Sequence, residues 1–244
     1  MELPSYSVLF PAKTDEIQIC CISLNMMDRI RLIAVPTPLV YQIRNAINNS
    51  WGQIQNERSY HGTHEFKVFG NPWIGSGDEA IRSRKLLTEM LVCMAQYGWN
   101  LVQATDVSKK DGDKDTIFFE LSKLIPTSRP CLFSISFNRT DRIRVIDPPS
   151  SDIVAAVKSA IKEDWHKGIA HETDYHGSVE FKLNGNPFWA DGQEAVTIRV
   201  MLAQMLSNLR HMGYKLYGSV DISHGHDGHD LESWVFRKVD ENWS

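Results

Sequence analysis

Residues 21–33 read CISLNMMDRIRLI, and residues 134–146 read SISFNRTDRIRVI. The two segments lie 113 positions apart, and matches with nearly the same offset continue through the rest of the chain. Trp51 returns as Trp165, and Asn71 returns as Asn186. A match this long, which no single motif carries, predicts a tandem duplication. We expect a first repeat over residues 1–125 and a second over 126–244. The junction, PTSRP at 126–130, is short, so the second repeat should pack against the first.

Each repeat shows the same alternation of strand and helix patterns. Apolar alternation predicts strands, and apolar residues at helical spacing predict helices. The segment after the first helix is polar and reads as a loop. The order expected in each repeat is therefore β-β-α-β-α-β-β, an α+β fold with mainly antiparallel sheets and the helices packed on one face. For the first repeat the expected elements are a hairpin of 17–24 and 28–35, a helix from Thr37, a strand around Phe66, a long helix over 78–97, and strands at 99–107 and 116–122.

Composition excludes several classes of protein. Hydrophobic residues make up 42% of the chain and charged residues 23%, which is typical of globular proteins. Lys and Arg number 26 against 30 Asp and Glu, so a dedicated nucleic-acid-binding protein, with its basic surplus, is not expected. No apolar run approaches the roughly 20 residues of a membrane span. The beginning of the sequence has no secretory signal pattern, and the four cysteines show no metal spacing, so we expect reduced thiols in a cytoplasmic protein.

A histidine-rich loop provides an alternative reading. Residues 224–230 read HGHDGHD, and His224, His226, His229 and Asp230 could bind zinc. The string is similar to the His-x-His-x-Asp-His signature of metallo-β-lactamase-like hydrolases, but Gly228 stands where that signature has aspartate. The corresponding loop of the first repeat, 108–115, has no histidine. The favoured interpretation is a solvated loop and no cofactor, and the alternative is a metal-dependent hydrolase that uses residues 221–230.

Four pairs of repeated residues are candidates for binding. The histidines of the Tyr-His-Gly strings could contact a ligand, although a structural role beside a glycine turn is favoured. The aromatic residue of the Asn-Pro-aromatic turn could be core or a binding anchor. The arginines at the border of the long helix could bind an anion, or link to Asp106 and Asp221 or to a backbone carbonyl. The candidate binding residues are Tyr60, His61, Trp73, Arg84, Tyr175, His176, Phe188 and Arg199.

The repeated polar residues all have plausible structural roles, and the unrepeated ones form no known catalytic set. Glu65 and Lys67, for example, read as a solvated charge pair on one strand. The sequence therefore favours a non-enzymatic tandem-repeat binding or adaptor protein with a protein partner, and without nucleic acid or a membrane span. A further alternative is a small-ligand-binding protein with a cleft between the repeats. The sequence leaves the oligomeric state open.

Overall fold

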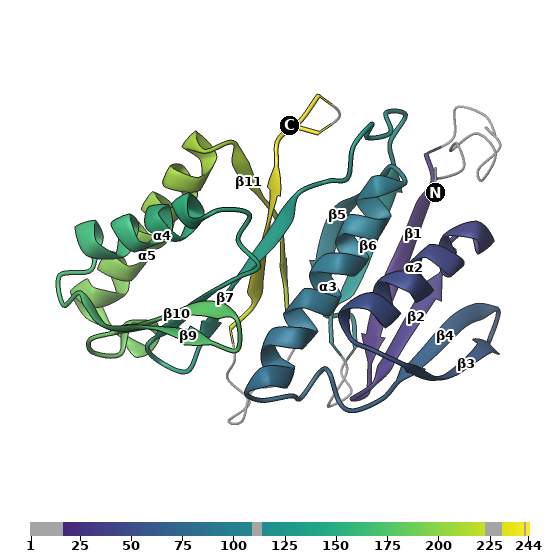
Figure 1. The fold of residues 1–244 in the computed structure, drawn as a ribbon, viewed down its shortest axis with the longest axis horizontal. Helices are drawn as coiled ribbons and strands as arrows, with labels where there is room; N and C mark the ends of the chain where they lie inside the picture. The colour runs from purple at the N-terminus through teal and green to yellow at the C-terminus, as the bar shows by residue number, and fades with distance from the viewer. Residues whose placement is uncertain (1–16, 109–113, 223–230, 242) are drawn as a thin grey trace.

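Each half of the chain folds into a six-stranded sheet with two helices on one of its faces (Figure 1). The computed structural model describes residues 17–108, 114–222, 231–241 and 243–244. The first repeat contains β1 (Ile19–Asn25), β2 (Arg29–Ile33), α2 (Thr37–Ser50), β3 (Ile54–Tyr60), β4 (Thr63–Val68), α3 (Asp78–Gln96), β5 (Trp99–Thr105) and β6 (Thr116–Leu121). The second contains β7 (Leu132–Asn138), β8 (Arg142–Ile146), α4 (Ser151–Asp164), β9 (Ile169–Tyr175), β10 (Ser178–Leu183), the short 3₁₀ helix η1 (Pro187–Trp189), α5 (Gly192–His211), β11 (Tyr214–Val220) and β12 (Ser233–Lys238).

The two sheets have the same topology. The first has the strand order β3-β4-β2-β1-β6-β5, and the second, read from its other edge, has the equivalent order β9-β10-β8-β7-β12-β11. The pairings between these strands are antiparallel. Two homologous α+β repeats, each with a mainly antiparallel sheet, are therefore confirmed. No helix among the described residues is long and apolar enough to cross a membrane.

Each repeat has one strand more than the sequence predicted. The polar segment after the first helix, expected to be a loop, forms β3 in the first repeat and β9 in the second. Both are edge strands, and most of their side chains are exposed or half-buried. A strand that buries neither face carries no apolar alternation, so its pairing with the neighbouring strand was not visible in the sequence.

A tryptophan closes the core at the same place in both repeats. Trp51 follows α2 and Trp165 follows α4, and both indoles are almost fully buried. The Trp51 indole N–H donates to the carbonyl oxygen of Phe69 at 2.7 Å, and that of Trp165 donates to Asn184 at 2.9 Å. The equivalence of these two tryptophans, predicted from the constant offset, is confirmed.

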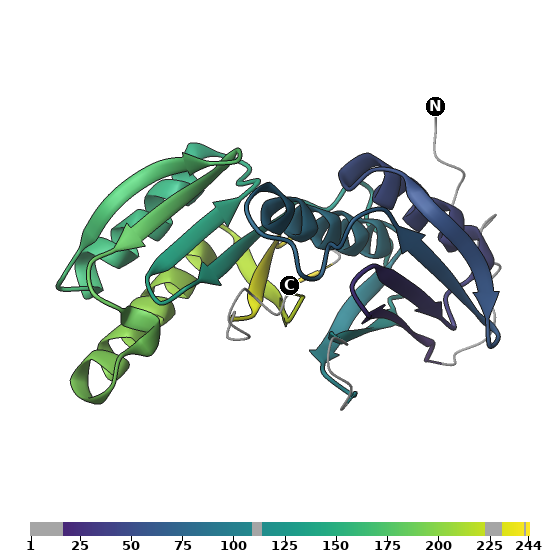
Figure 2. The ribbon, with the colours of Figure 1, turned by 90° about the horizontal axis from the view of Figure 1, so that it is seen from below.

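The long helix α3 lies between the two sheets. One of its sides packs on the first sheet with α2, and another lies against β7 and β8 of the second sheet (Figures 1 and 2). We call the face of each sheet opposite its own two helices the outer face. The outer face of the second sheet is thus covered by α3, and Lys85 of α3 reaches Asp147 after β8 at 2.8 Å. Among the described helices, none packs on the outer face of the first sheet (Figure 2).

Candidate functional site

A row of polar side chains crosses the outer face of the first sheet. The strand register places Ser23 of β1 beside Arg31 of β2, Arg31 beside Glu65 of β4, and Glu65 beside Arg58 of β3. Residues directly opposite each other on antiparallel strands project to the same face and lie in contact range. Four strands therefore contribute to one polar row.

Glu65 is the centre of this row. It is only 1% exposed, and its carboxylate accepts hydrogen bonds from Arg31 Nε at 2.7 Å, Arg58 Nε at 2.8 Å and Arg29 at 3.1 Å. Burial opposes ionisation of Glu65, but the hydrogen bonds and charges of Arg31 and Arg58 outweigh burial and hold its pKa below the ordinary value. The expectation that Glu65 and Lys67 form a solvated pair is wrong, because three arginines enclose the carboxylate.

Tyr60 and His61, two of the predicted binding residues, extend this cluster at the β3–β4 turn. The Arg31 guanidinium lies 4.4 Å from the centre of the Tyr60 ring, and that of Arg58 lies 5.0 Å from it. The His61 ring meets Tyr60 edge-on at 4.5 Å. His61 has φ +46°, a left-handed conformation that a tight turn imposes. The structure therefore places this tyrosine and this histidine beside the arginine cluster.

The second sheet carries most of the same arrangement. Arg144 Nε donates to Glu180 at 2.7 Å, Arg142 also donates to Glu180, and the Arg144 guanidinium lies 3.9 Å from the centre of the Tyr175 ring. The third arginine of the first sheet has no equivalent, because the residue opposite Glu180 on β9 is Thr173.

His176, the counterpart of His61, is part of the contact between the repeats. Its ring lies close to Gly77, the residue before α3: a side chain at position 77 would place its β-carbon 3.7 Å from the His176 Nε2 atom. The predicted pair Tyr175 and His176 is thus near the start of the helix that covers this sheet, and the His176 ring meets Tyr175 edge-on at 4.6 Å.

The outer face of the first sheet is cationic around Glu65, over β2, β3 and β4, whereas Glu120 of β6 brings a negative charge to the same face beside Ile19. Arg29, Arg31 and Arg58 surround the carboxylate of Glu65, and Asp28 pairs with Arg29 and Lys67 at the edge. Four cations therefore face two carboxylates, although the chain as a whole has a net charge of -4. The Arg58 side chain is 49% exposed and keeps donors open to solvent. Guanidinium groups of this kind bind carboxylates and stack on flat groups.

The sequence reasoning missed the arginines and Glu65 as site residues. The signal was present: Arg29, Arg31 and Glu65 return unchanged as Arg142, Arg144 and Glu180. Their cross-strand contact depends on strand register, which the sequence did not fix.

The predicted aromatic anchors lie in or near the cores. Trp73 is fully buried and its indole N–H donates to the carbonyl oxygen of Arg29 at 3.2 Å. Phe188 is half-buried, and its ring meets that of Phe137 at 5.4 Å. Trp73 therefore reaches the arginine cluster of the first sheet through the backbone of Arg29, whereas Phe188 lies in the second repeat.

The two predicted arginines of the long helices bind backbone carbonyls. Arg84 donates to the carbonyl oxygen of Ala80 at 2.9 Å, and Arg199 donates to that of Ala195. A backbone carbonyl was one of the two kinds of partner expected. A carboxylate was the other kind of partner expected, with Asp106 as one of the two candidates. The Asp106 carboxylate accepts a hydrogen bond from the Ser108 backbone N–H at 2.8 Å.

The predicted metal ligands His224, His226, His229 and Asp230 lie outside the described residues. Within the part of the chain that is described, no group of three or more His, Cys, Asp or Glu side chains could hold a metal ion. The zinc alternative stays a prediction from the sequence.

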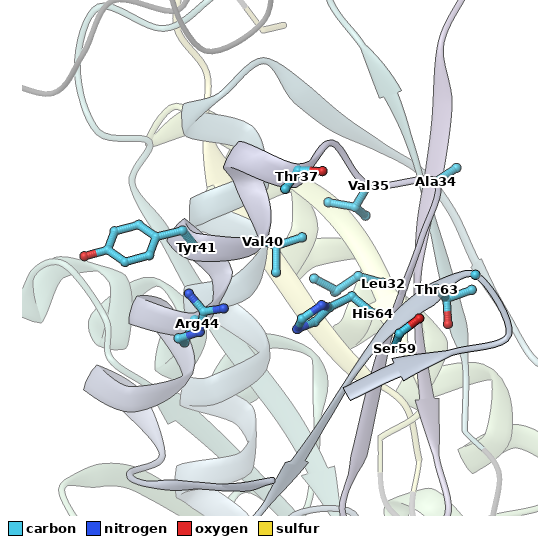
Figure 3. Close-up of a pocket in the computed structure, with 11 residues that line it drawn as sticks. Leu32, Ala34, Val35, Thr37, Val40, Tyr41, Arg44, Ser59, Thr63 and His64 are labelled. Atoms are coloured by element: carbon cyan, nitrogen blue, oxygen red, sulfur yellow. The ribbon is translucent and has the colours of Figure 1, made fainter. Parts of the chain in front are cut away.

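A pocket of about 480 Å³ lies between α2 and the β3–β4 hairpin (Figure 3). Leu32 and Val40 form apolar parts of its wall, and Arg44 and His64 bring nitrogen atoms to it. Both nitrogen groups are held by Glu57, which accepts from Arg44 Nε at 2.9 Å and lies 2.6 Å from His64 Nε2. This pocket is within the first repeat, whereas the small-ligand alternative expected a cleft between the repeats.

The ion pair beside this pocket also returns in the second repeat. Lys158 of α4 lies 2.5 Å from Glu172 of β9, at the positions of Arg44 and Glu57. A pair kept in both copies ties the first helix to the edge strand, so its presence does not by itself indicate a ligand.

Comparison with known proteins gives the same division of the chain. One domain-family model matches twice, over residues 18–120 and 132–237. The chain belongs to that family. It carries two copies of the family's domain, and each match covers one of the two sheets with its helices. No curated protein and no solved structure matches the chain.

Proposed function

We propose that this two-domain protein is a non-enzymatic binding protein that holds a helical segment of a protein partner against the outer face of its first sheet. The main support for this proposal comes from the chain itself, because its own helix α3 lies across the equivalent face of the second sheet. The two domains, taken as residues 1–125 and 126–244, therefore contain one version of this surface with a helix packed on it and one on which no described helix packs.

The centre of this surface suits a helix because its side chains are small. Ser134 and Ser136 of β7 are fully buried, on the face of the second sheet that α3 covers. The equivalent residues of β1 are Cys21 and Ser23. Small residues allow the backbone of a helix to approach a sheet closely. Cys21 and Ser23 are only 8% and 7% exposed in this chain, so a helix on the first sheet would also contact the longer side chains beside them, such as Arg31.

Charge supports an acidic helix as the ligand. The start of α3 carries Asp78 and Glu79 and lies near the β9–β10 turn. At the corresponding β3–β4 turn of the first sheet, the Tyr60 ring lies against Arg31 and Arg58, and His61 packs on Tyr60. Acidic residues in the first turn of a bound helix would complement these guanidinium groups and the positive end of the helix dipole.

A cytoplasmic location belongs to the same proposal. All four cysteines are free thiols, as a reducing compartment requires. Cell fractionation with a tagged chain would test this part independently of the binding activity.

The binding proposal is tested with a helix of known sequence. The probe is a fluorescent, stapled peptide of residues 76–97, added to the intact protein, in which the second sheet is already occupied by its own α3. We expect saturable binding by fluorescence anisotropy, weakened at least about tenfold by Arg58→Glu. Lys162→Glu, an exposed charge reversal on α4, is the matched control and should leave the affinity unchanged. Absence of saturable binding, or equal affinity for wild type and Arg58→Glu, would overturn the proposal.

A further inference from the structure

We infer that the helix bound by the first sheet is α5 of a second copy of this chain, so that copies join head to tail. The inference rests on the proposed function, because it uses the same face of the same sheet. It adds the identity of the partner and the surface that the partner contributes.

The helices α3 and α5 are equivalent in the two repeats but differ in burial along one stripe. In α3 this stripe contains Ile81, which is 1% exposed, and Thr88, which is 7% exposed. Their counterparts in α5 are Val196, which is 62% exposed, and Ala203, which is also exposed. Positions separated by three, four or seven residues share one helix face. The stripe that contacts the second sheet in α3 is thus turned to solvent in α5.

The exposed stripe of α5 is apolar where it begins. Val200 lies one turn after Val196 and is 51% exposed. Trp189, in the short helix η1 that contacts α5, is 72% exposed. Clustered exposed apolar side chains of this size are typical of interaction surfaces. Val200 replaces the partly buried Lys85 of α3, so α5 is the more apolar of the two helices on this side.

The outer face of the first sheet is the complementary surface. Ile19 at the start of β1 is 48% exposed, whereas its counterpart Leu132 on β7 is only 8% exposed. The apolar residue at this position is therefore buried on the second sheet, as Leu132, and partly exposed on the first, as Ile19.

Charge complementarity selects α5 over an arbitrary apolar helix. Asp191 precedes α5 and Glu194 is in its first turn, at the end of the helix that carries Val196. Glu194 already pairs with Lys167 at 2.5 Å, so Asp191 is the carboxylate of this pair that is exposed to solvent. A helix seated on the first sheet in the way that α3 sits on the second would bring these carboxylates toward Arg31 and Arg58. The interface would then join an apolar stripe to a small-residue seat and an acidic helix start to an arginine cluster.

Such a contact joins two different surfaces, so it is heterologous. Each copy offers one helix stripe, on α5, and one sheet face, on the first sheet. Within a single chain α3 already packs on the second sheet in this way, and the contact between copies would repeat that packing. Heterologous contacts build rings when the rotation closes and open chains when it does not. Either product is a concentration-dependent oligomer.

Two one-sided variants test this arrangement. Val196→Asp with Val200→Asp blocks the helix stripe, and Ile19→Asp with Arg58→Glu blocks the sheet face. Tyr41→Asp, on α2 and 57% exposed in the free chain, controls for loss of an exposed apolar group. Circular dichroism and melting temperature confirm that each variant folds.

Sedimentation velocity should show wild type and Tyr41→Asp forming oligomers as the concentration rises toward about 100 µM, a range in which weak interfaces assemble. Each blocked variant alone should stay monomeric. A 1:1 mixture of the two should form dimers and nothing larger, because only one open helix and one open sheet face remain. Monomeric wild type, or a mixture that does not dimerise, would overturn the inference. If self-association fails but the 76–97 peptide still binds, only this inference is overturned and the proposed function stands. If neither self-association nor peptide binding is observed, both are overturned.

Discussion

Arg84 and Arg199 occupy the same position in the two repeats, yet Arg84 is 1% exposed and Arg199 is exposed to solvent. Both donate to the carbonyl oxygen of the residue four positions earlier in their own helix. The difference between them comes from the neighbouring repeat, because the second sheet covers α3 while no described helix or sheet covers the same side of α5.

Arg84→Met should therefore destabilise the protein by about 1–3 kcal/mol, since it removes a buried charge-assisted hydrogen bond. Arg199→Met should change the free energy of unfolding by less than about 0.5 kcal/mol, as expected for a surface substitution. Urea denaturation followed by tryptophan fluorescence measures both. Equal effects of the two substitutions would contradict the asymmetry described above.

Glu65→Gln should weaken folding by about 1–3 kcal/mol at pH 7, because three arginines lose their shared carboxylate. Lys67→Gln, whose charge lies 3.7 Å from Asp28 and is 30% exposed, is the control and should cost less than about 1 kcal/mol. Thermal denaturation of both variants provides the comparison.

The effect of Glu65→Gln should also depend on pH. The pKa of Glu65 is lowered in the folded protein, so its carboxylate stabilises the fold above its unfolded pKa, and this contribution is lost as the pH falls through the folded value. The gap between wild type and Glu65→Gln should thus shrink below about pH 4. A gap that widens on acidification would reverse the assigned direction.

Asp115→Asn should stabilise the protein near neutral pH. Asp115 accepts a hydrogen bond from the Asp221 backbone N–H at 2.8 Å, and its own N–H donates to the Asp221 carbonyl oxygen at 3.3 Å. Burial, with a smaller contribution from the charge of Asp221, raises the pKa of Asp115 to about 6. The folded state therefore holds this proton more tightly than the unfolded chain, and wild-type stability falls as pH rises from about 4 to about 6.

Asparagine keeps an acceptor oxygen for the Asp221 N–H but carries no charge. The melting temperature of Asp115→Asn should exceed that of wild type at pH 7.5, and the two should converge at about pH 4. Differential scanning calorimetry at several pH values gives the test. A variant less stable than wild type at pH 7.5 would show that the ionised carboxylate is favourable.

Tyr217→Phe should loosen the contact between the repeats. The Tyr217 hydroxyl accepts a hydrogen bond from the Leu101 backbone N–H at 2.8 Å, so phenylalanine leaves that donor unpaired at a cost of about 1–3 kcal/mol. Tyr214→Phe is the matched control: its hydroxyl lies 3.6 Å from the Cys131 sulfur within the second repeat, and sulfur is a weak partner. Hydrogen exchange at Leu101 should accelerate only in Tyr217→Phe, and unchanged exchange there would count against this link.

The architecture was largely readable from local patterns. Apolar alternation located the strands around Phe66 and Phe181, and Gly98 marked the end of the long helix, where it adopts φ +81°. The edge strands β3 and β9 were missed because neither of their faces is buried. The role of Glu65 was also missed, because its arginine partners come from two other strands, 34 and 7 positions away.

The sequence by itself determined the duplication, the α+β class and the apolar faces that form each core, because these depend on periodicities within short segments. Only the tertiary structure decided which repeated residues differ in environment. Ile81 and Val196 are β-branched apolar residues at equivalent positions of α3 and α5, but Ile81 is buried and Val196 is 62% exposed. Local pattern specifies how a helix packs on its own sheet. The burial of its other side depends on a second sheet about fifty residues away in the chain, and that contact leaves no period in the sequence of the helix.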